Sequence, residues 1–161
     1  MKNITKQLGF LVLLGALVLS ACKADVSRND DGSVTVETAM TQAQLQEVIS
    51  SSIADPLIQD LSVSLQNGYV SVTGIRQRLN DSSKTDTMSF RLDLGVSNGE
   101  LTASISDAQI DGTAIEQNRV DNWNQTIANR ISKIGGGNRN ATLQSVSVTP
   151  EQVTMIWIVN Q

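Results

Sequence analysis

The 161-residue sequence contains no histidine and only one cysteine, Cys22. Without histidine, the chain cannot build a Ser-His-Asp triad or bind a metal ion through imidazole. With one cysteine it cannot form an internal disulfide, so its core must stabilise the fold. The acidic residues are scattered, and their spacing matches neither a glycosidase pair nor a calcium loop. Serine–lysine and carboxylate-pair chemistry stay open, but the sequence predicts a protein that is not an enzyme, has no cofactor and binds no metal.

Basic side chains are also few. The chain has 12 lysines and arginines against 16 aspartates and glutamates, and the basic residues form no run. Nucleic-acid binding needs clustered lysine and arginine on the phosphates, so we expect no nucleic-acid partner. The same acidic balance disfavours a domain that lies flat on anionic lipid through charge attraction.

The N-terminus carries the most informative pattern in the chain. Lys2 and Lys6 precede an uncharged, mostly apolar segment, residues 7–21, which ends in the run Leu-Ser-Ala before Cys22. A basic segment, an apolar segment and small residues are the order of a secretory signal. The apolar run is shorter than the roughly 20 residues that a membrane span needs. The arrangement resembles a bacterial lipoprotein signal, which implies that residues 1–21 are removed and that Cys22 is acylated.

Cleavage before Cys22 would leave 140 residues, enough for a single compact domain, with ten basic and sixteen acidic side chains. We expect residues 22–32 to be the acylated cysteine and a flexible polar tether, and residues 33–161 to be the domain. More than one acyl chain makes such an anchor stable. The chain would then be exported and held on the cell membrane or outer membrane. Lys23, where an aspartate would resemble an inner-membrane retention signal, favours the outer membrane. A plain signal peptide with an incidental cysteine is the alternative.

Alternating apolar and polar residues predict an antiparallel sheet built from hairpins. Asn67-Gly68 and Asn98-Gly99 each stand between two alternating runs, as in two-residue type I′ turns. Further strands are expected at 33–37 and in a last hairpin over 143–159, and the polar residues 80–86 predict a mobile turn. The two turns predict five cross-strand pairs: Leu65 with Val70, Val63 with Val72, Val96 with Leu101, Leu94 with Ala103, and Leu92 with Ile105.

Two segments have helical spacing. The first begins at Thr41, which can form a capping box with Gln44, and ends before Asp55-Pro56. The second covers about 116–134 and is followed by three glycines, 135–137. The order strand, helix, four strands, helix, two strands predicts an α+β fold in which a curved antiparallel sheet packs against two helices.

Each helix carries one apolar stripe, which has two interpretations. Such a stripe is normally core. It could also line a groove that holds an acyl chain, because ligand sites are concave and mostly apolar. The candidate lining residues are Leu45, Val48, Ile49, Ile53, Val120, Trp123, Ile127, Ile131 and Trp157.

The pattern over residues 33–159 resembles the tubular lipid-binding, or TULIP-like, domains of bacterial envelope proteins. The matching pieces are the helix start at 40–45, the hairpin at 61–74, the turn at 110–112 and the strand at 143–148. The resemblance implies a strongly curved sheet around a long helix, a role in binding or carrying envelope lipids, and no catalytic residues.

We therefore expect a membrane-anchored envelope lipoprotein whose domain binds lipid or another hydrophobic ligand without catalysis. This hypothesis predicts an apolar cavity between helix 41–54 and the sheet. The alternative is a structural or assembly lipoprotein that binds another envelope protein through a sheet edge or through an apolar patch near Ile156 and Ile158. It predicts a filled core.

Overall fold

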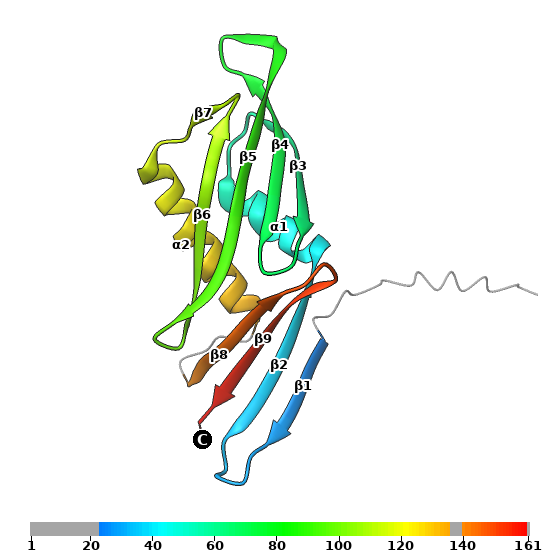
Figure 1. Ribbon diagram of the computed structural model, residues 1–161, viewed down its shortest axis with the longest axis vertical. Helices are drawn as coiled ribbons and strands as arrows, with labels where there is room; N and C mark the ends of the chain where they lie inside the picture. Colours follow the sequence, from blue (N-terminus) through cyan, green and yellow to red (C-terminus); the bar gives the residue numbers. More distant parts are fainter. Residues whose placement is uncertain (1–22, 136–139, 161) are drawn as a thin grey trace, which may run out of the picture.

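The structure is a computed structural model that describes residues 23–135 and 140–160. The predicted signal peptide and Cys22 lie outside the described residues, as do Gly136 and Gly137. The chain is α+β, with two helices and two antiparallel sheets, as Figure 1 shows. The predicted class and the predicted order of strands and helices are confirmed. The structure adds two strands to that order and divides the strands between two sheets.

Sheet A holds both ends of the described chain. Its strands lie in the order β1 (Lys23–Arg28), β2 (Val34–Thr41), β9 (Gln152–Val159) and β8 (Ala141–Val148). All neighbouring strands in this sheet are antiparallel.

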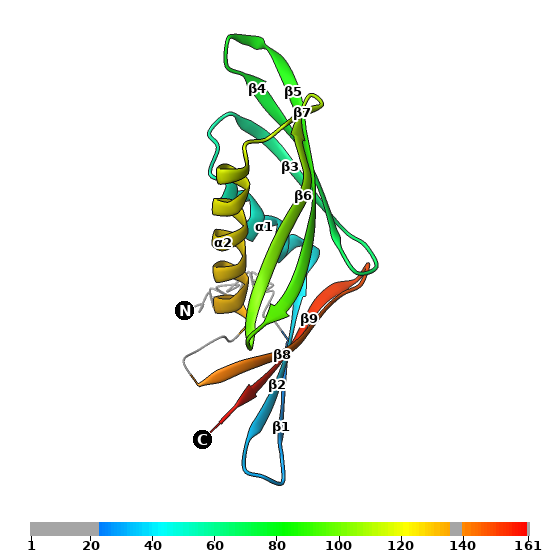
Figure 2. The same cartoon turned by 60° about the vertical axis from the view of Figure 1, so that its left-hand side comes forward.

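Sheet B comes from the middle of the chain. Its strands follow the sequence order β3 (Ile58–Leu65), β4 (Val70–Arg78), β5 (Asp81–Ser97), β6 (Glu100–Ile110) and β7 (Thr113–Ala114). The helices α1 (Gln42–Ile53) and α2 (Gln117–Ile134) lie on the same side of this sheet, and sheet A extends beyond them at one end of the molecule (Figures 1 and 2).

Helix α1 starts at the predicted capping box. The Thr41 N–H donates to Gln44 Oε1 at 2.8 Å, and the Gln44 N–H donates back to Thr41 Oγ1 at 3.4 Å. Met40 and Leu45 on either side of the cap are fully buried, as a hydrophobic staple requires. The helix ends at Ala54, whose φ of 46° turns the chain into Asp55-Pro56. Both ends lie within one residue of the prediction.

The hairpins have the predicted registers. Leu65 pairs with Val70 and Leu94 with Ala103, and the other three predicted pairs are also present. Asn98 and Gly99 have φ of 53° and 77°, as a type I′ turn needs. The type I′ prediction is wrong at Asn67-Gly68, because only Gly68 has a positive φ. The Gly68 N–H is used in a 2.9 Å hydrogen bond to the Val148 carbonyl, which ties this turn to sheet A.

The structure corrects the prediction of a flexible tether over residues 23–32. Residues 23–28 form β1, which pairs with β2. The turn between them is closed by the Asn29 N–H on the Ser33 carbonyl at 2.9 Å, and Asp31 Oδ1 accepts from the Ser33 hydroxyl at 2.6 Å. These local hydrogen bonds give a polar segment a defined conformation, although it has almost no core of its own.

The polar segment 80–86 also forms regular structure where a turn was predicted. Strand β5 starts at Asp81, and Gln77 pairs with Thr85 and Arg76 with Asp86. Arg78 Nε donates to Asp86 Oδ1 at 2.7 Å across the ribbon. Cross-strand charge pairing thus extends the β4–β5 hairpin beyond the apolar part of the sheet.

The core lies between the two helices and the inner faces of both sheets. The rings of Trp123 on α2 and Phe90 on β5 have centroids 6.1 Å apart. The end of α2 joins sheet A through Thr38, whose hydroxyl donates to the Gly135 carbonyl at 3.0 Å and accepts from Trp157 Nε1 at 3.3 Å. Among the described residues, a cluster of 24 buried apolar side chains makes the core continuous from one sheet to the other.

Candidate functional site

All nine residues predicted to line a ligand groove are buried in this core. Leu45, Ile49, Ile127 and Ile131 are fully enclosed, and the other five are almost so. Val48 also borders a groove at the surface. Without a rearrangement of the core, a ligand in this groove would therefore contact Val48 and none of the other eight residues.

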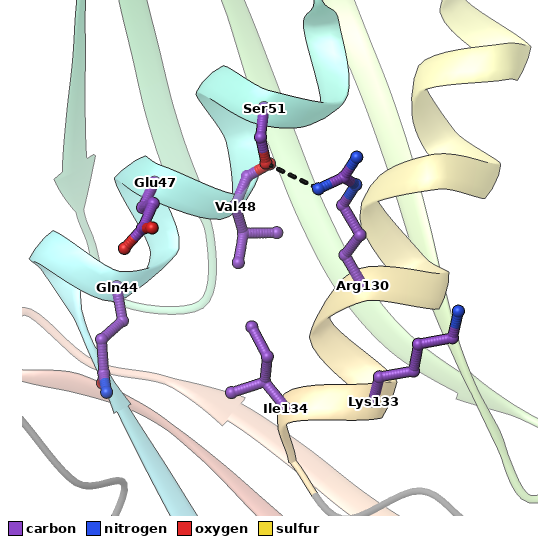
Figure 3. Close-up of a pocket in the computed structure, with 7 residues that line it drawn as sticks. All are labelled: Gln44, Glu47, Val48, Ser51, Arg130, Lys133 and Ile134. Carbon is purple, nitrogen blue, oxygen red and sulfur yellow. Dashed lines mark hydrogen bonds between the residues drawn. The ribbon is translucent and has the colours of Figure 1, made fainter.

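The surface groove lies between α1 and α2 and has a volume of about 400 Å³ (Figure 3). We call it the helix groove. Val48 and Ile134 face each other across it, and Ile134 is 43% exposed. Arg130 reaches from α2 to α1, where its Nη1 donates to Ser51 Oγ at 3.0 Å. Its lining residues are Gln44, Glu47, Val48, Ser51, Arg130, Lys133 and Ile134.

Helical spacing explains how the sequence builds this groove. Positions 44, 47, 48 and 51 are three or four residues apart, so their side chains lie on one face of α1. Positions 130, 133 and 134 share one face of α2 in the same way. The sequence interpretation followed only the apolar members of each stripe and missed the polar ones beside them. Their 3–4 spacing next to the stripe was the available signal.

The charges around the helix groove are unevenly paired. Glu47 lies on the α1 side, and Arg130 and Lys133 lie on the α2 side. Within residues 23–135 and 140–160, neither of these two cations forms an ion pair. An anionic group placed against α2 would bond to Arg130, and to Lys133 once its side chain turned toward the groove, without breaking an existing ion pair.

A second groove, of about 380 Å³, lies between β6 and α2. Its α2 side consists of Asp121, Asn124, Gln125, Ala128 and Asn129, and it contains no cation. Its lining includes the apolar residues Leu101, Ala103 and Ala128, but it lacks the positive charge of the helix groove. The helix groove is therefore the better candidate for an amphiphilic ligand.

The helix groove lies close to the start of β1, which follows Cys22 in the sequence. Lys23 pairs with Ala39 on β2, and β2 runs directly into α1, which contributes Gln44 to the groove. Because residue 23 already belongs to a strand, an anchor on Cys22 would hold this part of the domain at the membrane surface.

The most enclosed charged cluster in the described chain is centred on Asp55. Its carboxylate accepts from Arg76 Nε at 2.9 Å, Arg119 Nη2 at 2.7 Å and the Leu57 N–H at 2.9 Å, and its side chain is 7% exposed. Burial raises the pKa of Asp55, but the hydrogen bonds from Leu57, Arg76 and Arg119 outweigh burial and hold the pKa below its ordinary value. The carboxylate is fully engaged in joining β4 and α2 to the end of α1. Asp55 also borders a small surface pocket, but both of its carboxylate oxygens already accept hydrogen bonds, so its geometry is structural.

Neither helix of the described chain combines the length and the apolar character that crossing a bilayer requires. Across residues 23–135 and 140–160, no three acidic or cysteine side chains come together as ligands for a metal ion.

The sequence matches no model of a known protein family, and neither curated proteins nor solved structures give a match. The resemblance to TULIP-like domains therefore stays a prediction.

Proposed function

We propose that this chain is an exported lipoprotein, anchored through acyl chains on Cys22, whose domain binds an anionic amphiphile in the helix groove without catalysis. The proposal rests on two features of the groove lining. Val48 and Ile134 give it an apolar surface, and α2 contributes two cations, Arg130 and Lys133. An acyl or isoprenoid segment would contact this apolar surface. An anionic headgroup, such as a phosphate or carboxylate, would contact the two cations.

The size of the groove supports partial binding of a lipid. About 400 Å³ is at the lower end of the range for small-molecule pockets, roughly 300–1,000 Å³. A headgroup with the first part of one chain fits this volume, and a whole diacyl lipid does not. The rest of the lipid would stay in the bilayer, which suits a groove close to the anchor.

The test is native mass spectrometry of the protein purified from membranes in mild detergent. The wild-type chain should retain an anionic lipid. The double variant Arg130→Ala, Lys133→Ala should bind it at least tenfold more weakly, since a hydrogen bond to a charged group contributes about 1.5–3 kcal/mol. Lys84→Ala is the matched control, because Lys84 is an exposed cation on β5 that does not line the groove. A lipid-free mass for the wild type under all conditions, or equal retention by the double variant, would reject the proposal.

The second candidate is an assembly lipoprotein that binds another chain through a sheet edge. The filled core favours this candidate, as does β1, where every side chain from Ala24 to Arg28 is exposed. The apolar patch expected near Ile156 and Ile158 is less open than expected, because both side chains are half-buried on the outer face of sheet A. The edge, rather than this face, is the better candidate contact.

A further inference from the structure

Most strand edges of this fold are covered by other parts of the chain. At β3, the Val63 N–H donates to Gln46 Oε1 at 3.4 Å and the Leu65 N–H donates to Gln42 Oε1 at 3.3 Å. At β6, the Ile105 N–H donates to Asn124 Oδ1 at 2.9 Å. These amide side chains on α1 and α2 occupy backbone groups that would otherwise accept another strand.

The outer edge of β8 is covered by sheet B. The Leu143 N–H donates to the Gly99 carbonyl at 2.7 Å, and the Val148 carbonyl accepts from the Gly68 N–H at 2.9 Å. Both contacts come from hairpin turns of sheet B. Strand β8 is therefore covered near both of its ends.

The edge of β1 is different. In an antiparallel pair of strands, hydrogen-bonded and non-hydrogen-bonded residue pairs alternate. Because the Asn29 N–H donates to the Ser33 carbonyl, Asn29 and Ser33 form a hydrogen-bonded pair, and every second pair from there along β1 and β2 is also hydrogen-bonded. Ser27 and Asp25 therefore bond to β2, and the backbone groups of Ala24 and Val26 point away from it. Among the described residues, no hydrogen bond reaches these outward groups. The Val26 side chain is 68% exposed beside them.

We propose that β1 pairs with β1 of a second copy of this chain, antiparallel and centred on Val26, so that sheet A continues across both copies. This goes beyond the ligand-binding proposal and gives the assembly candidate its partner. The outward amide and carbonyl groups of Val26 would bond to those of Val26 in the other copy. The two copies are then related by a two-fold axis, as in most homodimers.

The side chains of β1 favour this register. Directly opposite residues in an antiparallel pair share a face, so a two-fold pairing must be centred on a residue. Centring on Asp25 would put two carboxylates opposite each other, next to Glu37, which already faces Asp25 on β2. Centring on Val26 puts valine against valine on one face. It puts Asp25 opposite the Ser27 hydroxyl of the other copy on the other face.

The predicted membrane anchor would compensate for the small contact area of a single strand pair. One strand pair buries less than the roughly 1,000 Å² expected of a stable interface. Two copies on one bilayer have a high effective concentration, which compensates for a small contact. The inference therefore rests on acylation at Cys22 but not on a ligand in the helix groove.

Cysteine cross-linking of the full chain in native membranes tests this contact. In Val26→Cys, two copies would bring their Cα atoms to about 5.5 Å, within disulfide range. Mild oxidation should convert most of this variant into a covalent dimer. Leu79→Cys is the control for random collision, because Leu79 is 75% exposed and lies outside sheet A. It should stay monomeric.

Proline variants test the same contact without a thiol. Val26→Pro removes an outward N–H and leaves the β1–β2 ladder intact, so differently tagged copies should no longer co-purify while the melting temperature stays close to wild type. Ser27→Pro removes an N–H bonded to β2 and should lower the melting temperature. Equal cross-linking of the two cysteine variants, cross-linking of Val26→Cys only to a chain of another mass, or co-purification unaffected by Val26→Pro would overturn the proposal. A disulfide dimer of the wild type would show that Cys22 is free, and the anchor would fail separately.

Discussion

The two sheets differ in how far other parts of the chain cover their edges and faces. Sheet B has both helices on one face, and side-chain amides from these helices bond to the backbone of its strands β3 and β6. Sheet A meets the end of α2 at Thr38, extends past the helices and ends at an uncovered β1. Natural proteins protect strand edges against pairing. An edge left open beside protected ones is what the proposed pairing of two copies requires.

The difference suggests a division of roles. Sheet B and the helices form the scaffold and position the helix groove. Sheet A connects that scaffold to the predicted anchor and presents the open edge. Three perturbations test this division.

The largest effect is expected at Asp55, which ties sheet B to both helices. Asp55→Ala would leave Arg76 without its partner in a poorly exposed site, and breaking a buried ion pair costs about 3–5 kcal/mol. We expect a loss near the lower end of this range, because Arg119 is partly exposed, measured by urea unfolding. Asp93→Ala is the control. Its pair with Arg91 is exposed and should contribute about 0–1 kcal/mol. Equal losses in the two variants would contradict the structural role of Asp55.

The same carboxylate gives the fold a pH dependence. The pKa of Asp55 is lower in the folded protein than in the unfolded chain, so its contribution is fully present above the unfolded pKa, about 3.9. The contribution is lost as the pH falls from there through the folded pKa. The difference in unfolding free energy between wild type and Asp55→Ala should therefore shrink below about pH 4. A difference that stays constant down to pH 2 would contradict this account.

A smaller effect is expected at the joint between sheet A and α2. Thr38→Val keeps the shape of the side chain but leaves the Trp157 indole N–H and the Gly135 carbonyl without their partner, which should cost about 1–3 kcal/mol. The measurement is again urea unfolding. Thr154→Val, a half-buried threonine on the other face of the same sheet, should change stability by less. A neutral Thr38→Val would show that the two parts are joined by apolar packing alone.

Local patterns predicted much of this fold. The alternation around Asn98-Gly99 and the Thr41–Gln44 capping box each depend on residues a few positions apart, and both appear as expected. The division into two sheets depends on long-range contacts such as Gly68 with Val148, which no local pattern contains.

Two features of the interaction surfaces were harder to predict. Strand β1 is polar and lacks a buried face, so its composition resembles that of a loop. The Asp31-Gly32 turn and the alternation of Ala24 and Val26 were the available signals of a hairpin, and the tether prediction did not use them. The helix groove depends on Arg130 and Lys133 coming opposite Glu47, which requires the packing of α1 against α2. An apolar stripe predicts burial, but it does not predict which polar neighbours border a groove.

Amide hydrogen exchange by NMR, on the mature protein in detergent micelles, tests the open edge most directly. When the protein is dilute and monomeric, the Ala24 and Val26 amides should exchange much faster than those of Asp25 and Ser27, and the Ile105 amide of sheet B should be protected. When copies are concentrated together, Ala24 and Val26 should become protected as well. Equal protection of all four β1 amides in the monomer, or no protection of Ala24 and Val26 when copies are together, would contradict the account.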